Sequence, residues 1–148
     1  MRLAFDEGLI VTTKFDPEMA ALADRHYSRR TPGARQFMYS GRTLVLRDAA
    51  GLVLFGWYWA RADLRMDGQG GYCCAIFRNE SARRSSDIIL EAERRAFERW
   101  GPGRLFTYVD PAKVRSPNPG YCFKRAGWRF AGLASGGKHL LVKEPADG

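Results

Sequence analysis

The sequence predicts a single α/β domain of the α+β type, built on a mixed and mostly antiparallel sheet. The chain has 148 residues, enough for one core that buries roughly two-thirds of the unfolded surface without disulfides or metal. Short β-rich runs alternate with helical segments along it. Because the helix expected near residues 85–100 connects two strands, it forms a crossover, and those two strands should pair in parallel.

The first half of the chain should form a strand, a helix and a three-stranded antiparallel meander. Leu9–Thr13 is the first β-rich run. Asp16 is the expected N-cap of a helix that has Pro17 at its first position and runs to about His26. Ser28–Phe37 has the composition of a loop. The meander comprises the expected strands Arg42–Asp48, Leu52–Arg61 and Tyr72–Phe77, with a hairpin turn at Ala49–Gly51.

The second half should form the crossover helix and three further strands. Ser85 or Ser86 is expected to cap a helix that runs through Trp100, and Gly101–Gly103 should end it. Its apolar stripe, opposite Arg and Glu, comprises Ile88, Ile89, Ala92, Ala96 and Phe97. The remaining expected elements are the strand Arg104–Asp110, a short helix at Asn118–Ala126, and the strands Trp128–Leu133 and His139–Lys143.

The charge of the chain indicates a polyanionic partner. The net charge is +8, and nineteen of the 24 basic residues are Arg. Arg binds phosphate in a planar, bidentate manner, so an Arg-rich basic surface is typical of nucleic-acid binding. A genome whose codons favour Arg over Lys is the alternative explanation.

Neither a membrane segment nor a disulfide framework is expected. The best apolar run, Leu52–Ala60, is about half of the roughly 18 residues that cross a bilayer. Acidic residues interrupt the N-terminal stretch where a signal peptide would be apolar. The three Cys are an odd number, and the neighbours Cys73 and Cys74 would alternate to opposite faces of a strand. We therefore expect a cytoplasmic protein with buried apolar thiols and no membrane partner.

The order of the elements resembles the GNAT acyltransferase fold over nearly the whole chain. This resemblance implies helices on both faces of the sheet and a splayed pair, the fourth and fifth strands, that holds acyl-CoA. It places the CoA pyrophosphate at the start of the crossover helix, here within Arg78–Leu90 (RNESARRSSDIIL), where helix N–H groups and Arg side chains favour an anion. The donor-binding residues expected on this basis are Arg78, Asn79, Arg83, Arg84, Ser85, Ser86 and Asn118.

Two features depart from the usual GNAT pattern. The segment Arg78–Leu90 contains no Gly, although the family's loop has closely spaced glycines. The segment Cys122–Trp128 (CFKRAGW) has Phe123 where the family has the Tyr that protonates the departing thiolate. Tyr121, two residues earlier, would face about 200° away on a helix.

A narrower resemblance accounts for both of these departures. The pair His26–Tyr27, the FRNES and RRSS segments, and the long run Thr107–Trp128 resemble the Mom-type DNA-modification proteins of phages, a divergent GNAT-like group. The resemblance implies transfer of a carbamoylmethyl group to the exocyclic N6 amine of adenine in double-stranded DNA, which protects phage DNA from restriction. A phage protein of this kind would act in the host cytoplasm.

The residues expected at such a site come from two segments, residues 25–35 and 110–121. The expected catalytic residues are His26, Tyr27, Asp110, Ser116 and Tyr121. The expected phosphate clamp for DNA comprises Arg25, Arg29, Arg30 and Arg35. The donor is an unidentified small molecule, with acyl-CoA or a related compound as candidates. No metal is predicted, because the sequence has no compact set of ligands such as two His and a carboxylate at fixed spacing.

Four of the candidates also have a structural interpretation. His26 is also consistent with an exposed residue at the carbonyl end of a helix, and Tyr27 with a core residue. Asp110 before Pro111 is typical of an Asx turn. Asn118 is typical of a helix N-cap with Pro119 at the first position, and we expect capping as its main role.

The aromatic run on the second meander strand has a split expectation. Residues alternate between the two faces of a strand. We expect Trp57 and Trp59 to fill the core, and Tyr58 to line the opposite, functional face.

Two other functions remain open at this point. One is an acyl-CoA-dependent N-acetyltransferase that acts on a small amine or a protein. The other is a non-catalytic nucleic-acid-binding module that keeps the fold and the charge.

Overall fold

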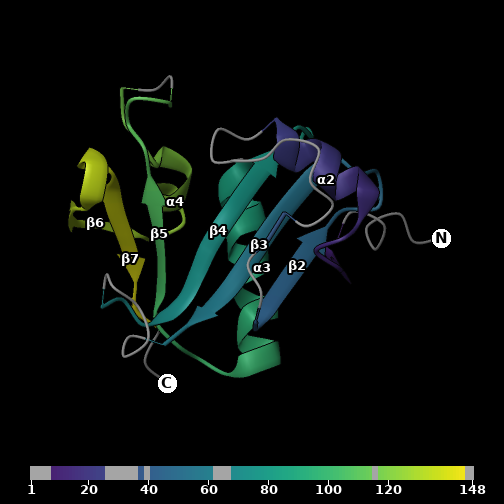
Figure 1. Cartoon of the computed structure of the whole chain (residues 1–148), viewed down its shortest axis with the longest axis horizontal. Coiled ribbons are helices and arrows are strands. Elements are labelled where there is room, and N and C mark those ends of the chain that lie inside the picture. Colours follow the sequence, from purple (N-terminus) through teal and green to yellow (C-terminus); the bar gives the residue numbers. More distant parts are fainter. Residues whose placement is uncertain (1–7, 26–36, 39–40, 62–67, 115–116, 146–148) are drawn as a thin grey trace. The chain divides into compact units, whose positions relative to one another are not determined.

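The computed structural model describes residues 8–25, 37–38, 41–61, 68–114 and 117–145 (Figure 1). Its helices are α2 (Pro17–Asp24), α3 (Ser85–Trp100) and α4 (Tyr121–Arg125). Its strands are β1 (Ile10–Thr12), β2 (Thr43–Arg47), β3 (Val53–Ala60), β4 (Gly71–Asn79), β5 (Leu105–Val109), β6 (Arg129–Leu133) and β7 (His139–Lys143). The strand order is β1-β2-β3-β4-β5-β7-β6. The predicted sequence of elements and the mixed, mostly antiparallel sheet are confirmed.

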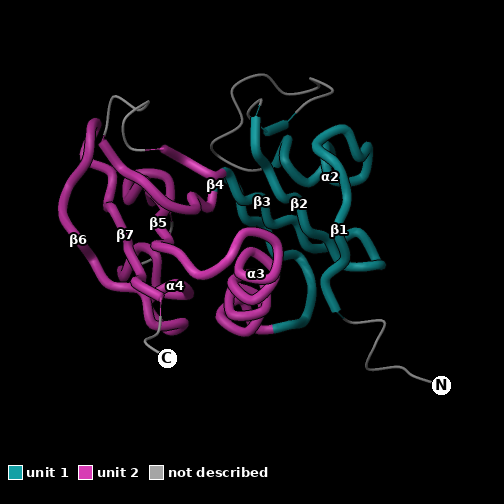
Figure 2. The backbone as a smooth tube through the Cα atoms, turned by 90° about the horizontal axis from the view of Figure 1, so that it is seen from below, with its two compact units in different colours: residues 1–58, 75–83 teal, residues 59–74, 84–148 magenta. Residues whose placement is uncertain are grey.

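The described chain divides into two compact units (Figure 2). The N-terminal unit comprises residues 1–58 and 75–83, and the C-terminal unit comprises residues 59–74 and 84–148. The single domain expected from the sequence stays a prediction. In the described part of the chain, no helix has the length and apolar character needed to span a bilayer.

In the N-terminal unit, α2 packs on the meander. β2 pairs antiparallel with both β1 and β3. The buried cluster between helix and strands comprises Met19, Leu22, Ala23, Met38, Val45, Leu54 and Ile76. Tyr58 packs against this cluster, so its side chain contributes to the core beside α2. Trp57 is completely buried, as predicted.

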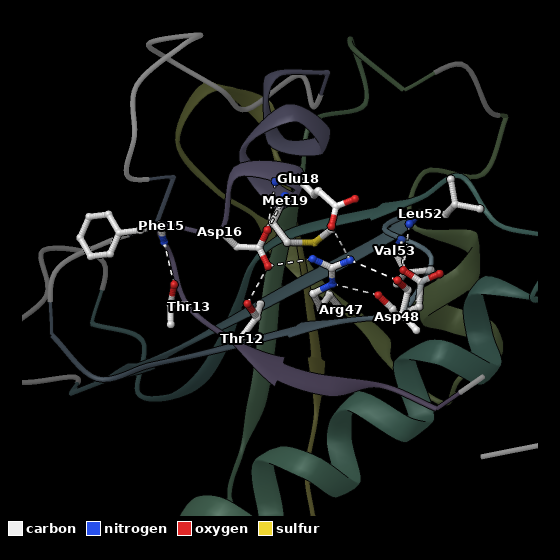
Figure 3. A network of polar contacts seen from close by, with 11 residues as sticks. Thr12, Thr13, Phe15, Asp16, Glu18, Met19, Arg47, Asp48, Leu52 and Val53 are labelled. Carbon is white, nitrogen blue, oxygen red and sulfur yellow. Dashed lines mark hydrogen bonds and ion pairs between the residues drawn. The ribbon is translucent and has the colours of Figure 1, made fainter. Parts of the chain in front are cut away.

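A polar network joins the start of α2 to the β2–β3 hairpin (Figure 3). Asp16 is the N-cap, as predicted, and its Oδ1 accepts from the N–H groups of Glu18 and Met19 at 3.0 and 3.2 Å. Its Oδ2 accepts from Thr12 Oγ1 at 2.7 Å and from Arg47 Nη1 at 2.9 Å. Burial alone would raise the pKa of Asp16, but these hydrogen bonds lower it.

The β2–β3 hairpin at the other side of the network is also held by side-chain hydrogen bonds. Arg47 Nε donates to the carbonyl of Asp48 at 2.9 Å. The Asp48 carboxylate accepts from the N–H groups of Leu52 and Val53 at 2.8 and 2.9 Å. The network thus fixes both the turn and the helix that starts beside it.

In the C-terminal unit, α3 is the crossover between the parallel strands. The parallel pairs are Tyr72↔Leu105, Cys73↔Phe106 and Cys74↔Thr107, which confirms the predicted parallel pairing. The ring of Tyr72 lies 5.2 Å from Trp100 and 5.6 Å from Trp59, centroid to centroid. Trp59 therefore joins an aromatic cluster at the end of α3, as expected for a packing residue.

Two expectations about α3 are wrong. Its N-cap is Arg84, with no side-chain hydrogen bond, and Ser85 is the first helical residue. Ser86 is buried, so neither Ser caps the helix. Glu93, assigned to the polar side of the helix, is only 5% exposed. Its carboxylate accepts hydrogen bonds from Trp128 and Lys143, which explains how a charged group is tolerated there.

Asp16 should contribute more to stability than Glu18, its neighbour in the same network. Asp16→Ala removes the helix cap and leaves Arg47, whose side chain is 11% exposed, without its buried partner. We expect a loss of about 2–3 kcal/mol in the free energy of unfolding. Glu18→Ala breaks an ion pair whose carboxylate is 65% exposed, and should cost less than about 0.5 kcal/mol. Urea denaturation measures both, and equal losses would contradict the assignment.

Candidate functional site

The parallel ladder ends at a side-chain hydrogen bond. Thr107 Oγ1 donates to the carbonyl oxygen of Cys74 at 2.8 Å, at the last of the three parallel pairs. β5 continues to Val109, and Tyr108 and Val109 pair with Leu140 and His139 of β7. The end of β5 is therefore held by β7, and the chain then enters the segment that leads to α4.

The loop between β4 and α3 is ordered by its own side chains. Asn79 Oδ1 accepts from the N–H and the hydroxyl of Ser81 at 2.9 and 2.6 Å. Asn79 Nδ2 donates to the carbonyl of Arg83 at 2.8 Å, and the N–H of Arg83 donates to Ser81 Oγ at 3.2 Å. An amide and a hydroxyl thus supply the order of a loop that has no Gly. Because the N–H groups of Ser81 and Arg83 point to these oxygens, they do not form an anion cradle as they stand.

The first turn of α3 has an exposed Arg at its N-cap and an exposed acid, Asp87, within it. The N–H groups of Asp87 and Ile88 donate to the Arg84 carbonyl, so Ser85 and Ser86 precede the first intrahelical bond. Helix N–H groups at this position are the usual donors to phosphate. Arg84 is exposed, so a cation stands beside them. Of the residues predicted to bind the donor, Arg84, Ser85 and Ser86 are therefore grouped at one helix end.

Arg78 belongs to a different cluster, with Arg25 and Glu80 in the N-terminal unit. Glu80 Oε2 accepts from Arg25 Nε and Arg78 Nε, both at 2.8 Å. Arg78 Nη1 also donates to the carbonyl of Arg25, just after the last residue of α2, at 2.9 Å. Hydrogen bonds from Arg25 and then Arg78 lower the pKa of Glu80 to about 2. Two residues assigned to different ligands, DNA and donor, thus share one carboxylate.

Asp110 adopts the structural role that its sequence allows. Its Oδ1 accepts from the N–H of Ala112 at 3.0 Å, and its carbonyl accepts from the N–H of Lys113 at 3.1 Å. This is an Asx turn. The residue is half-buried at the end of β5, so the turn also fixes where its carboxylate lies.

The helix α4 begins later than predicted. Its N-cap is Gly120, with φ 76°, so the predicted cap at Asn118 and first position at Pro119 are wrong. A Cβ at residue 120 would collide with Leu141, so the close approach of the chain to β7 requires Gly. Asn118 is exposed, and its Oδ1 instead accepts from Lys124 Nζ at 2.7 Å.

The two aromatic side chains of α4 have opposite environments. Phe123 is 7% exposed, and its ring meets Trp128 edge to face at 4.8 Å. Tyr121 is 53% exposed, with the guanidinium of Arg125 at 6.0 Å from its ring centroid. Phe123 is therefore a core residue, and Tyr121 carries the accessible hydroxyl of this helix.

The thiols match the predicted packing role in part. Cys73 and Cys74 are buried, whereas Cys122 is intermediate in exposure. Burial raises the pKa of the Cys122 thiol, which lowers its nucleophilicity at neutral pH. In the described ranges, no three His, Cys, Asp or Glu gather as a group that could hold a metal.

Several predicted site residues lie outside the described residues. They are His26, Tyr27, Arg29, Arg30, Arg35 and Ser116. Thr107, Glu80 and Glu93 are not among the residues that the sequence predicts for the site. The sequence signals for these residues are a hydroxyl within a strand, an acid between two Arg-rich segments, and an acid beside an apolar stripe. Each of these features is common in proteins, so none of them indicates a site.

Comparison with known proteins identifies the fold. No family model matches the chain, and no curated protein matches its sequence. A solved structure assigned as a GnaT-family acetyltransferase from Bordetella pertussis aligns with a TM-score of 0.59 and 13% identity, over 92% of this chain and 95% of that one. Another, assigned as a phosphinothricin N-acetyltransferase, aligns with a TM-score of 0.58 and 15% identity, over 95% of this chain and 100% of that one. The fold is GNAT-like.

The Glu80 cluster should titrate at unusually low pH. The pKa of this carboxyl falls from 4.5 to about 2 on folding, so the unfolded state binds the proton more readily. The stability that Glu80 contributes is full above about pH 5 and is lost as pH falls toward 2. The melting temperature of the wild type should exceed that of Glu80→Gln at pH 5 and above, and this difference should narrow as the pH falls toward 2. A difference in melting temperature that stays constant between pH 5 and 2 would contradict the stabilisation of ionised Glu80 by Arg25 and Arg78.

Proposed function

We propose that this protein is a GNAT-type transferase that moves an acyl group from a CoA thioester to an amine. The observation that carries the proposal is the crossover from β4 through α3 to β5, within a fold that aligns with acetyltransferases over more than nine-tenths of its length. The crossover brings the start of α3 and the end of β5 to the same edge of the sheet. Ligands of open α/β sheets bind at that edge.

The chain's own residues have separate roles in this proposal. The start of α3, with Arg84, Ser85 and Ser86, would hold a phosphate of the donor. The donor supplies an activated thioester, from which the acceptor amine takes the acyl group as the carbon–sulfur bond breaks. The amine must lose a proton and the thiolate must gain one. Since Phe123 is buried, Tyr121 and Asp110 are the described groups assigned to these proton transfers.

Modification of DNA is a second candidate for the same fold. Between residues 105 and 143 the chain has seven Lys and Arg against one acid, Asp110. Lys113, Arg125, Arg129 and Lys138 are exposed in this segment, as are Tyr121 and Phe130, at 53% and 48%. Cations interspersed with aromatic side chains favour a nucleic acid, through phosphate contacts and base stacking. The acceptor would then be the N6 amine of adenine, as the Mom-type resemblance implies.

Donor binding should depend on the first turn of α3. We expect saturable binding of acetyl-CoA in calorimetry, weakened about three- to tenfold by Arg84→Ala, because one exposed phosphate contact is lost. Arg94→Ala removes an exposed Arg from the middle of the same helix and should leave the affinity unchanged. Absence of acetyl-CoA binding, or equal loss in both variants, would overturn this donor assignment.

The acceptor can be identified by mass spectrometry. DNA from cells that express the protein, digested to nucleosides, should contain a new adenosine species if adenine is the acceptor. An acetylated amine formed from acetyl-CoA in vitro would instead favour the N-acetyltransferase function. Salt-dependent DNA binding without either product, unchanged in His26→Ala and Ser116→Ala, would indicate a non-catalytic nucleic-acid-binding module.

A further inference from the structure

Glu93 is a charged residue on the buried side of α3. It is 5% exposed, among Ile89, Ala92 and Ala96, which are completely buried. A carboxylate in such a place is tolerated only where donors satisfy it. Both of its oxygens have one: Trp128 Nε1 donates to Oε2 and Lys143 Nζ donates to Oε1, each at 2.8 Å.

The contacts of Glu93 continue to α4. Lys143 Nζ also donates to the carbonyl of Ala126, the C-cap residue of α4, at 2.8 Å. Trp128 packs its ring against Phe123 of α4, and the backbone N–H of Trp128 donates to the Phe123 carbonyl at 3.0 Å. Each carboxylate oxygen of Glu93 therefore holds a residue that in turn holds α4.

The helix needs such external support. It has five residues, and its N-cap Gly120 provides no side-chain hydrogen bond. A helix of this length is not stable by its own hydrogen bonds. Its orientation also has a functional consequence, because Phe123 faces the core while Tyr121, in the same turn, is exposed. The two residues are two positions apart, about 200° around the helix, so a rotation of that size would exchange the buried and the exposed side chain, and a smaller one would turn the Tyr121 side chain away from its present direction.

We propose that Glu93 is a positioning residue, which sets the orientation of α4 through Lys143 and Trp128 and so fixes the direction of the Tyr121 hydroxyl. The proposal rests on the transferase function only for its catalytic consequence, because the geometry of α4 can be measured without activity. It gives a residue of α3 a role in the proton transfer assigned to Tyr121 of α4.

The first test is structural and uses the full chain. The double variant Glu93→Gln, Lys143→Met removes both charges together, so that no buried charge is left unpaired. We expect the α4 amides of Lys124 and Ala126 to exchange with deuterium at least about tenfold faster, whereas the α3 core amides change little. The indole N–H of Trp128 should also shift in the proton–nitrogen NMR spectrum. Glu98→Gln, the same change at a 71% exposed position of α3, is the matched control and should alter neither signal.

The second test measures catalysis. If α4 is misdirected, kcat should fall about tenfold or more while the Kd for acetyl-CoA is unchanged. Uniformly faster exchange throughout the C-terminal unit, or unchanged exchange in α4, would overturn the positioning role. If the wild type transfers no acyl group, the transferase proposal fails, and the exchange measurement still decides the role of Glu93. Altered α4 exchange with wild-type kcat would refute the catalytic consequence.

Discussion

The parallel pairing of β4 with β5 is the constraint on which the arrangement of the candidate site depends. Two parallel neighbours require a crossover, and α3 provides it. The start of α3 and the end of β5 consequently meet the same edge of the sheet, where the chain has its exposed Arg84 and its half-buried Asp110. The hydrogen bond from Thr107 to Cys74 lies at the last parallel pair, and beyond it β5 continues to Val109 with β7 as its neighbour.

Much of this architecture could be predicted because the determining signals are local. Asp16–Pro17 marks a helix start through cap geometry, and the apolar stripe of α3 marks its buried side. Because a helix connects β4 to β5, the two strands can be predicted to be parallel without knowledge of any contact between distant residues. The start of α4 could not be obtained in this way, because it depends on the approach of Gly120 to Leu141, which is on another strand.

The candidate site was less predictable, since side-chain chemistry admits several partners. Arg78 is equally suited to a phosphate and to a carboxylate, and the structure gives it Glu80. Asn79 is suited to a ligand and to an Asx turn, and it orders its own loop. Glu93 lies at the border between the apolar and the polar face of α3. Its carboxylate is tolerated on the buried side because Trp128 and Lys143, far along the chain, donate hydrogen bonds to it.

The two ends of α3 differ in their side-chain hydrogen bonds. At the C-terminal end, the Tyr72 hydroxyl shares its one proton between the carbonyl oxygens of Trp100 and Gly101, at 3.0 and 2.8 Å. At the N-terminal end, Arg84 caps the helix without a side-chain hydrogen bond. The protein thus compensates the negative pole of the helix internally and gives no side-chain cap to the positive pole. The positive pole of α3 lies in the residues that follow β4, where the acidic side chain of Asp87 stands in the first turn, and a helix dipole favours negative charge at that end.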